Sequence, residues 1–254
     1  MSDFVVVIPA RYASARLPGK PLRNIAGKSM LQHVYERGLE SDAGQIIIAT
    51  DDQRIDKAAT AFGAIVCMTG IHHRSGTDRL AEVAAIHEWP DDQVVVNLQG
   101  DEPLMPAGLI NQCAGLLTDE RADIATLASP MLQAADMDNP NIVKVVTDDD
   151  GFALYFSRAA IPYSRSPETE PLAAQTARHH HGIYAYRTKT LRTIVAAELS
   201  AIEKCEQLEQ LRAMSLGLKI KVATPATRPG PGIDTEEDLE KAERQMNESG
   251  TSRA

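Results

Sequence analysis

The chain has 254 residues, of which 43% are hydrophobic and 24% are charged, so it can form one large globular domain or a core with a smaller appendage. Its formal net charge of −9 argues against general binding to nucleic acid or to an anionic membrane surface. A polyanionic ligand would therefore have to be held by a local cluster of cations or by a metal ion.

The three cysteines are isolated and odd in number. Cys67, Cys113 and Cys205 match no zinc or redox spacing, which predicts buried thiols in a reducing compartment. No apolar run approaches the roughly 18 residues of a membrane span, and Ser2-Asp3 before a strand does not resemble a signal peptide. We expect a cytoplasmic protein.

Short apolar runs alternate with helix-like segments through the first part of the chain. The strand-like runs lie at 4–8, 45–50, 64–68 and 93–98. Helical patterns cover 28–40, the stretch from Asp51 to Gly63, and 80–89. This alternation predicts parallel βαβ units and an α/β fold with a doubly wound, mostly parallel sheet.

The pattern changes in the second half. Strand-like runs at 141–147 and 153–157 flank Asp148-Asp149-Asp150-Gly151, which predicts a hairpin. Further on we expect a strand at 182–187, helices at 188–197 and 203–216, a strand at 219–224 and a helix at 234–246. The chain then divides into a core of residues 1–130, a smaller antiparallel insertion of 131–218, which is a lid or a dimer arm, and a return to the core over 219–254.

A basic loop follows the first strand. Arg11, Arg16 and Lys20 lie among small residues, prolines and a glycine, directly after Pro9 ends the apolar run. Ligands of open α/β sheets bind beyond the carboxyl ends of the strands, and backbone N–H groups with cations suit phosphate. We predict polyphosphate binding; the alternative is a solvated basic loop.

Two acidic segments are candidate metal sites. Asp101, in Gln99-Gly100-Asp101-Glu102-Pro103, ends a buried strand, where a carboxylate can hold Mg²⁺; the alternative is a cap for the helix after Pro106. Asp234 follows glycines and precedes the last helix, so capping explains most of its surroundings, although such a loop can also direct a carboxylate into a site.

Other polar groups carry weaker signals. On a strand His180 points away from His179 and His181, so the three cannot chelate one ion, and a single histidine in a substrate pocket is the better interpretation. Asp148-Asp149-Asp150 resembles the acidic triplet of glycosyltransferases but is better explained by the hairpin. Glu206, Glu209, Gln210 and Arg212 share one predicted helix, which is typical of a solvated face.

Together these segments resemble one family. Over residues 4–243 the chain is similar to the 3-deoxy-manno-octulosonate cytidylyltransferases, also called CMP-Kdo synthetases. The sialate-activating relatives share the nucleotidyltransferase core, but their basic loop lacks the sequence YASARLPGKPL. The motifs that carry the resemblance are IPARYASARLPGKPL (8–22), SGTDRLAEV (75–83), VNLQGDEP (96–103), NPNIVKVV (139–146), ALYFSR (153–158), GIYAYR (182–187), LEQLR (208–212) and PGIDTEEDL (231–239).

The resemblance implies a nucleotidyltransferase-like fold and Mg²⁺-dependent transfer of CMP from CTP to the anomeric 2-hydroxyl of 3-deoxy-D-manno-octulosonate (Kdo) for lipopolysaccharide synthesis. It also implies a homodimer, with the insertion binding the sugar acid. The implied catalytic and metal residues are Arg11, Lys20, Asp101 and Asp234, the last two holding Mg²⁺. The implied binding residues are Arg11, Arg16, Lys20, Arg74, Ser75 and Arg79 for the nucleotide, and Gln99, Arg158, His180, Tyr184, Glu209 and Gln210 for the sugar acid.

Two departures from the family pattern stand out. His72-His73-Arg74 replaces an acid–His pair before SGT, and His181 replaces a hydrophobic residue, so His180 matches the family's substrate histidine. Three other functions stay open: a relative acting on another acidic sugar such as a sialic acid, a non-catalytic nucleotide sensor, and a retaining glycosyltransferase that uses Asp148–Asp150.

Overall fold

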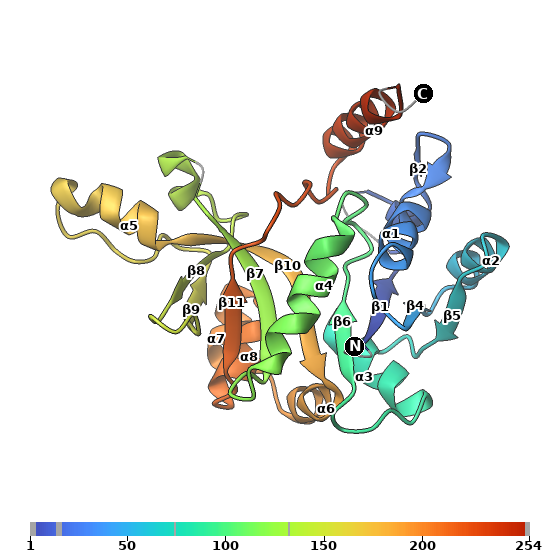
Figure 1. Ribbon diagram of the computed structural model, residues 1–254, viewed down its shortest axis with the longest axis horizontal. Helices are drawn as coiled ribbons and strands as arrows, with labels where there is room; N and C mark the ends of the chain where they lie inside the picture. The colour runs from blue at the N-terminus through green and yellow to red at the C-terminus, as the bar shows by residue number, and fades with distance from the viewer. Residues whose placement is uncertain (1–3, 14–16, 74, 132, 252–254) are drawn as a thin grey trace.

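The computed structural model describes residues 4–13, 17–73, 75–131 and 133–251 and shows one large sheet with helices on both faces (Figure 1). Its strands are β1 (Phe4–Ala10), β4 (Gln45–Thr50), β5 (Ile65–Met68), β6 (Val94–Asn97), β7 (Ile124–Pro130), β8 (Lys144–Thr147), β9 (Ala153–Ser157), β10 (Arg178–Arg187) and β11 (Ile220–Ala223), with β2 (Asn24–Ile25) and β3 (Lys28–Ser29) forming a separate pair.

The helices are α1 (Met30–Leu39), α2 (Gln53–Ala61), α3 (Gly76–Ile86), α4 (Ala107–Gly115), α5 (Glu170–Thr176), α6 (Thr188–Ala196), α7 (Ala201–Glu206), α8 (Gln210–Ser215) and α9 (Glu236–Thr251). Short 3₁₀ turns are η1 (Lys20–Leu22), η2 (Leu116–Thr118), η3 (Ala134–Asp138) and η4 (Pro167–Thr169). No helix in the described ranges combines the length and the apolar composition that crossing a membrane requires.

The sheet is mostly parallel, as predicted. Its strand order is β11-β7-β10-β6-β1-β4-β5, and β8 with β9 extends from β10. The pairs β6–β1, β1–β4, β4–β5 and β7–β11 are parallel, whereas β10 runs antiparallel to β6 and β7. One reversed strand therefore lies inside the sheet and joins the first half of the chain to the second.

Three expectations about single elements were wrong. Strand β7 was not foreseen, because in IATLASP the apolar residues are divided by Thr126 and form no long run. The strand expected at 182–187 begins four residues earlier, at Arg178. The helix expected at 203–216 is two helices, separated at Gln207, whose backbone has a positive φ of 53°.

Two apolar layers cover the sheet. Leu31 and Val34 of α1 and Ile110 of α4 pack with β1 and β6 on one face. Leu80 of α3 and Leu191 of α6, together with residues of α8, pack on the other face. The expectation of buried thiols is confirmed for Cys67 and Cys113 and wrong for Cys205, which is exposed.

The acidic triplet forms the predicted hairpin turn. Asp148 Oδ1 accepts a hydrogen bond from Phe152 N at 2.7 Å, and Gly151 has a φ of +78° between β8 and β9. Asp150 pairs with Arg121 at 2.8 Å. These contacts account for the triplet as a structural turn, which leaves the glycosyltransferase hypothesis without support.

The C-terminal coil is held against the end of β6. A side chain at Gly230 would place Cβ 2.3 Å from Leu104 Cβ, so only glycine permits this approach. Ile233 N then donates to Asp101 O at 2.9 Å, and Ile233 packs with Leu17 and Met30. The coil thus places residue 234 beside the loop after β6, before α9 begins.

Candidate active site

Lys20 joins three distant segments of the chain. Its Nζ donates to Asp101 Oδ2 at 2.6 Å and to Asp234 Oδ1 at 2.9 Å, residues 81 and 214 positions away. Desolvation would lower the pKa of Lys20, but the two carboxylates outweigh it and raise the pKa. The structure therefore brings together three of the four residues predicted to be catalytic.

The cluster holds more negative than positive charge. Glu102 lies beside it, and desolvation, reinforced by Asp101 and Asp234, raises the pKa of Glu102 to about 8. No group of three or more metal-binding side chains is found within the described ranges. Two carboxylates facing one point nevertheless fit a hard divalent cation such as Mg²⁺, which completes its shell with water and phosphate oxygens.

Arg11 and Lys20 line a cavity of about 200 Å³ at the carboxyl end of β1. The Nη2 atom of Arg11 is buried and has no hydrogen-bond partner. Gly100 forms part of the wall, and a Cβ there would lie 3.0 Å from the Pro9 carbonyl oxygen. An unpaired guanidinium nitrogen beside an ammonium group suits an anionic ligand. Arg16, also predicted for the triphosphate, and Arg74, predicted for the nucleotide, lie outside the described residues.

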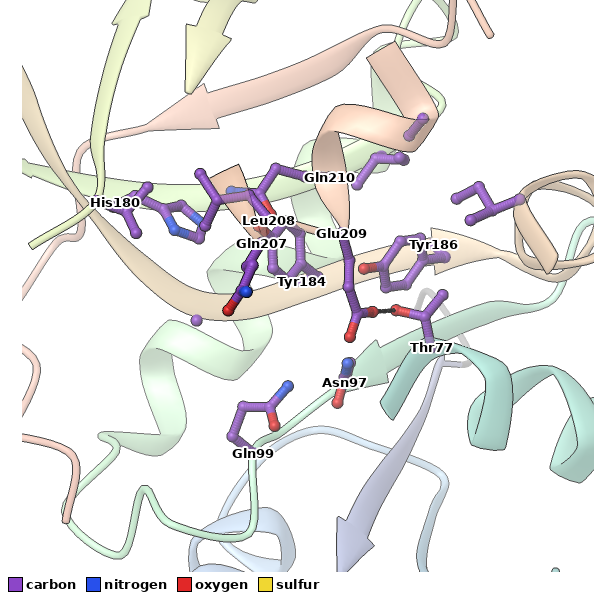
Figure 2. Close-up of a pocket in the computed structure, with 15 residues that line it drawn as sticks. Thr77, Asn97, Gln99, His180, Tyr184, Tyr186, Gln207, Leu208, Glu209 and Gln210 are labelled. Atoms are coloured by element: carbon purple, nitrogen blue, oxygen red, sulfur yellow. Dashed lines mark hydrogen bonds between the residues drawn. The ribbon is translucent and has the colours of Figure 1, made fainter. Parts of the chain in front are cut away.

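A second cavity of about 240 Å³ adjoins the first and is shown in Figure 2. It lies between β6, β10 and the start of α8, and Gln99 lines both cavities. Five of the six residues predicted for the sugar acid line this cavity: Gln99, His180, Tyr184, Glu209 and Gln210.

Several polar atoms of this pocket are buried without a partner. They are Asn97 Oδ1, the Tyr184 hydroxyl and Gln210 Nε2. Buried polar groups are nearly always satisfied, so such a concentration indicates groups that a ligand completes. Donors and acceptors both occur in the set, which suits a ligand with several hydroxyl groups.

Glu209 connects the pocket to α3. Figure 2 shows its carboxylate directed at Thr77, whose hydroxyl donates to Glu209 Oε2 at 2.7 Å. Ser75 caps the same helix: its Oγ accepts from Asp78 N at 3.1 Å and Asp78 accepts from Ser75 N. Ser75, which was predicted to bind the nucleotide, is therefore held at the N-terminus of α3, two residues before Thr77, which lines the second cavity.

The histidines alternate as predicted. The rings of His179 and His181 lie 5.0 Å apart on one face of β10. His180 faces the other way, with its ring 5.1 Å from Phe156 and 5.2 Å from Tyr184. Desolvation, followed by the neighbouring histidines, lowers the pKa of His180 to about 3, so the ring is neutral near pH 7.

Arg158 does not line the pocket. Its Nε donates to Glu206 O at 2.8 Å and its Nη1 to Pro140 O at 2.9 Å, while its backbone N donates to Glu206 Oε2 at 2.9 Å. These bonds join the end of β9 to the end of α7. Arg158 therefore supports the Gln207 turn, from which the pocket residues of α8 begin.

Arg79 is enclosed in the protein. Its side chain has no exposed surface; Nη2 donates to Asp51 Oδ2 at 2.9 Å and Nη1 donates to Thr69 Oγ1. In this conformation the guanidinium ties α3 to the ends of β4 and β5. The predicted contact with a nucleotide gains no support from these bonds.

Asn97 and Thr77 line the pocket and Thr126 contacts the pocket residue His180, but none of the three was foreseen as a site residue from the sequence. Asn97 interrupts an otherwise apolar strand, and that buried polar position was a usable signal. Thr77 lies in the SGT motif and lines the pocket. Thr126 Oγ1 lies 3.0 Å from His180 Nε2, but its strand was itself not predicted, so the sequence carried no signal for it.

A family model described as "Cytidylyltransferase" matches residues 5–220. With the loop, the carboxylate cluster and the adjoining pocket in place, the chain is a cytidylyltransferase, an enzyme of the nucleotidyltransferase class. A solved cytidylyltransferase from Leptospira borgpetersenii serovar Hardjo-bovis (strain JB197) has the same fold, with a TM-score of 0.62 and 15% identity, covering 97% of this chain and 87% of that one.

More similar relatives narrow the assignment. The 3-deoxy-manno-octulosonate cytidylyltransferase of Vibrio cholerae serotype O1 (strain M66-2) is 50% identical over 95% of this chain and 97% of its own, and that of Aliivibrio fischeri (strain MJ11) is 51% identical over 94% and 97%. A solved CMP:2-keto-3-deoxy-manno-octonic acid synthetase complexed with CTP has a TM-score of 0.89 and 43% identity, covering 98% of this chain and 100% of that one. The chain belongs to the 3-deoxy-manno-octulosonate cytidylyltransferase family.

The enclosed Arg79–Asp51 pair predicts a large effect on stability. Arg79→Met should lower the free energy of unfolding by about 3–5 kcal/mol, because it leaves the Asp51 carboxylate without its buried partner. Arg192→Met is the matched control, since Arg192 pairs with Asp91 on the surface and its loss should change stability by about 1 kcal/mol or less. Urea unfolding followed by circular dichroism measures both. Equal effects of the two substitutions would contradict a structural role for Arg79.

Proposed function

We propose that the protein transfers CMP from CTP to the anomeric 2-hydroxyl of Kdo and releases pyrophosphate. The observation that carries the proposal is the position of Gln99, which lines both the cationic cavity and the polar pocket. A phosphate held in the first cavity and a sugar hydroxyl held in the second would meet at this residue. The printed names of the relatives support CTP and Kdo as the two substrates.

In this mechanism Arg11 and Lys20, with Arg16 of the same motif, hold the triphosphate. Their charges would offset the negative charge that builds up on the phosphoryl oxygens, and their contacts would keep the α-phosphorus in line with the attacking hydroxyl. Positioning and charge stabilisation are the main requirements of such a displacement. The chain therefore needs no covalent intermediate.

Asp101 and Asp234 are the residues that would hold Mg²⁺, since both face the Lys20 ammonium group. A bound Mg²⁺ would acidify the sugar hydroxyl and neutralise phosphate charge. Lys20 in turn keeps the two carboxylates close together.

Residues of the polar pocket orient the sugar acid. Gln99, His180, Tyr184 and Gln210 offer donors and acceptors to its hydroxyl groups, while Glu209 accepts hydrogen bonds and remains tied to Thr77. Arg158 acts on the pocket by holding the turn at Gln207. We propose that it reaches the sugar carboxylate only if it gives up its bonds to backbone carbonyls.

The turn before α3 serves the nucleotide. Arg74 and Ser75, the latter held by its capping-box hydrogen bonds, would lie near cytosine and ribose. Arg79 would support the turn through its buried ion pair with Asp51. We therefore propose the same division of the chain as before: residues 1–130 bind the nucleotide, residues 131–218 bind the sugar acid, and residues 219–254 return to the core.

We further propose a homodimer formed by the projecting part of the insertion. Figure 1 shows α5 extending away from the sheet, on the side where the β8–β9 hairpin lies. Leu154, Tyr163 and Leu172 of this region are 60%, 86% and 62% exposed. Large exposed apolar side chains on one projection are typical of a protein interface.

We also propose that the protein acts in the cytoplasm, where it supplies CMP-Kdo for lipopolysaccharide synthesis.

Pyrophosphate release tests the function. The protein with CTP, Mg²⁺ and Kdo should release pyrophosphate, and omission of any one component should abolish release. Replacing Kdo by a sialic acid or an amino-dideoxy octulosonate separates the rival acidic-sugar activities. Binding of CTP without turnover of any acid would favour the nucleotide sensor.

The carboxylate cluster predicts a loss of turnover with little change in fold. Asp101→Asn and Asp234→Asn should each reduce kcat by several orders of magnitude, because a ligand to the reaction metal acts chiefly on the transition state. Asp42→Asn, a change at the carboxylate that accepts from Asn111 on the surface, is the matched control. Near-normal turnover of a folded Asp234→Asn variant would remove Asp234 from the metal site.

The unpartnered Tyr184 hydroxyl predicts opposite effects on stability and binding. Tyr184→Phe removes an unsatisfied buried group, so the unliganded protein should be at least as stable as the parent. Affinity for Kdo should fall about fivefold to tenfold if the ligand completes this hydroxyl. Thermal unfolding and Kdo titration in the presence of CTP measure the two effects. A variant that loses stability and keeps its affinity would show a structural role instead.

A further inference from the structure

Thr126 contacts three groups of the pocket wall. It lies on β7 with no exposed surface, and its Oγ1 is 2.7 Å from Ile183 O, 3.3 Å from His181 O and 3.0 Å from His180 Nε2. Two of these neighbours are carbonyl oxygens, which only accept. The single hydroxyl proton of Thr126 therefore points to a carbonyl, with Ile183 O the nearer.

The direction of the third bond follows. With its proton already donated, Thr126 Oγ1 can only accept from the imidazole, so His180 Nε2 carries the ring proton. The ring is neutral, and Nδ1 is then left without a proton. In the other tautomer the one Thr126 proton could go either to His180 Nε2 or to Ile183 O; lone pairs would then face each other at the remaining contact, and one hydrogen bond would be lost.

A break in the β10–β7 register creates this contact. His181 pairs with Leu127 and Tyr184 pairs with Thr126, so Gly182 and Ile183 are extra residues on β10. Such bulges redirect side chains and are frequent beside active sites. Here the irregularity brings the Ile183 carbonyl to Thr126, and His180 and Tyr184 lie with their rings 5.2 Å apart.

We propose that Thr126 is a positioning residue that holds His180 in the Nε2–H tautomer, so that Nδ1 serves as a hydrogen-bond acceptor for a hydroxyl group of the sugar acid. The role toward the sugar rests on the proposed function. The tautomer itself rests on the geometry of the unliganded protein. The pocket would then offer acceptors at His180 Nδ1 and Asn97 Oδ1 and a donor at Gln210 Nε2, a mixture that matches hydroxyl groups, which donate and accept.

Nitrogen NMR of histidine-labelled protein reads the tautomer directly. The signals of His180 are assigned by their absence from the spectrum of His180→Gln. The parent should show a protonated Nε2 and an unprotonated Nδ1, and Thr126→Val should lose this preference because valine cannot accept. Thr126→Ser, which keeps the hydroxyl, should restore it.

Kinetics on the same proteins connect the tautomer to the sugar. Thr126→Val should raise KM for Kdo about tenfold, the effect of one hydrogen bond, and leave KM for CTP unchanged. Thr126→Ser should return KM for Kdo to within about threefold of the parent. Thr188→Val is the matched control: Thr188 is also fully buried and donates to Gln93 O, away from the pocket, so neither KM nor the His180 signals should change.

A protonated Nδ1 in the parent overturns the proposal even if Thr126→Val does not fold. A folded Thr126→Val variant with the parent's tautomer and KM for Kdo also overturns it. If the parent shows the Nε2–H tautomer but does not turn over CTP and Kdo, the proposed function fails and the role toward the sugar fails with it. The NMR result would then still establish the tautomer of His180 in the unliganded protein, without a role in sugar binding.

Discussion

The double hydrogen bond of Lys20 is the contact on which the site depends. An ammonium group between two carboxylates holds the loop after β1, the end of β6 and the coil before α9 at one point. Without a cation there, Asp101 and Asp234 would repel each other next to Glu102, whose pKa is raised chiefly by burial and further by these two carboxylates. The two hydrogen bonds of Lys20 thus join these three segments at one point.

The reversed strand β10 explains how two halves of the chain share one site. The βαβ units of the first half bring the loops after β1 and β6 to the same edge of the sheet. Strand β10 runs in the opposite direction, so its first half, with His180, extends past the end of β6, and Tyr184 lies opposite Asn97, the last residue of β6. The cationic cavity is therefore lined by residues at and after the ends of β1 and β6, whereas β10 supplies His180 and Tyr184 to the polar pocket.

The sequence allowed prediction wherever one local pattern decides the structure. Apolar runs such as Val5–Ile8 identified the parallel strands, and the motifs around Lys20, Asp101 and Asp234 located the cluster. Prediction failed where tertiary contacts decide. Gln207 adopts a positive φ without a glycine signal because Arg158 and Glu206 hold the turn. Thr126 and its register break were invisible because β7 is stabilised by its neighbours, not by its own composition.

Because Asp234 lies after the last strand of the sheet, proteolysis near the C-terminus can separate it from the rest of the cluster. During synthesis the ribosome delivers Lys20 and Asp101 early, and the last strand of the sheet, β11, ends at Ala223, before Asp234 is made. Every strand of the sheet precedes Asp234 in the sequence, so no strand pairing of the sheet involves this residue. Cleavage by a protease in the coil after β11, where Ala226, Thr227 and Arg228 are exposed, would leave the nine strands of the large sheet in one fragment and Asp234 in the other. A clipped chain of this kind would retain its sheet and its Lys20–Asp101 contact without a complete site.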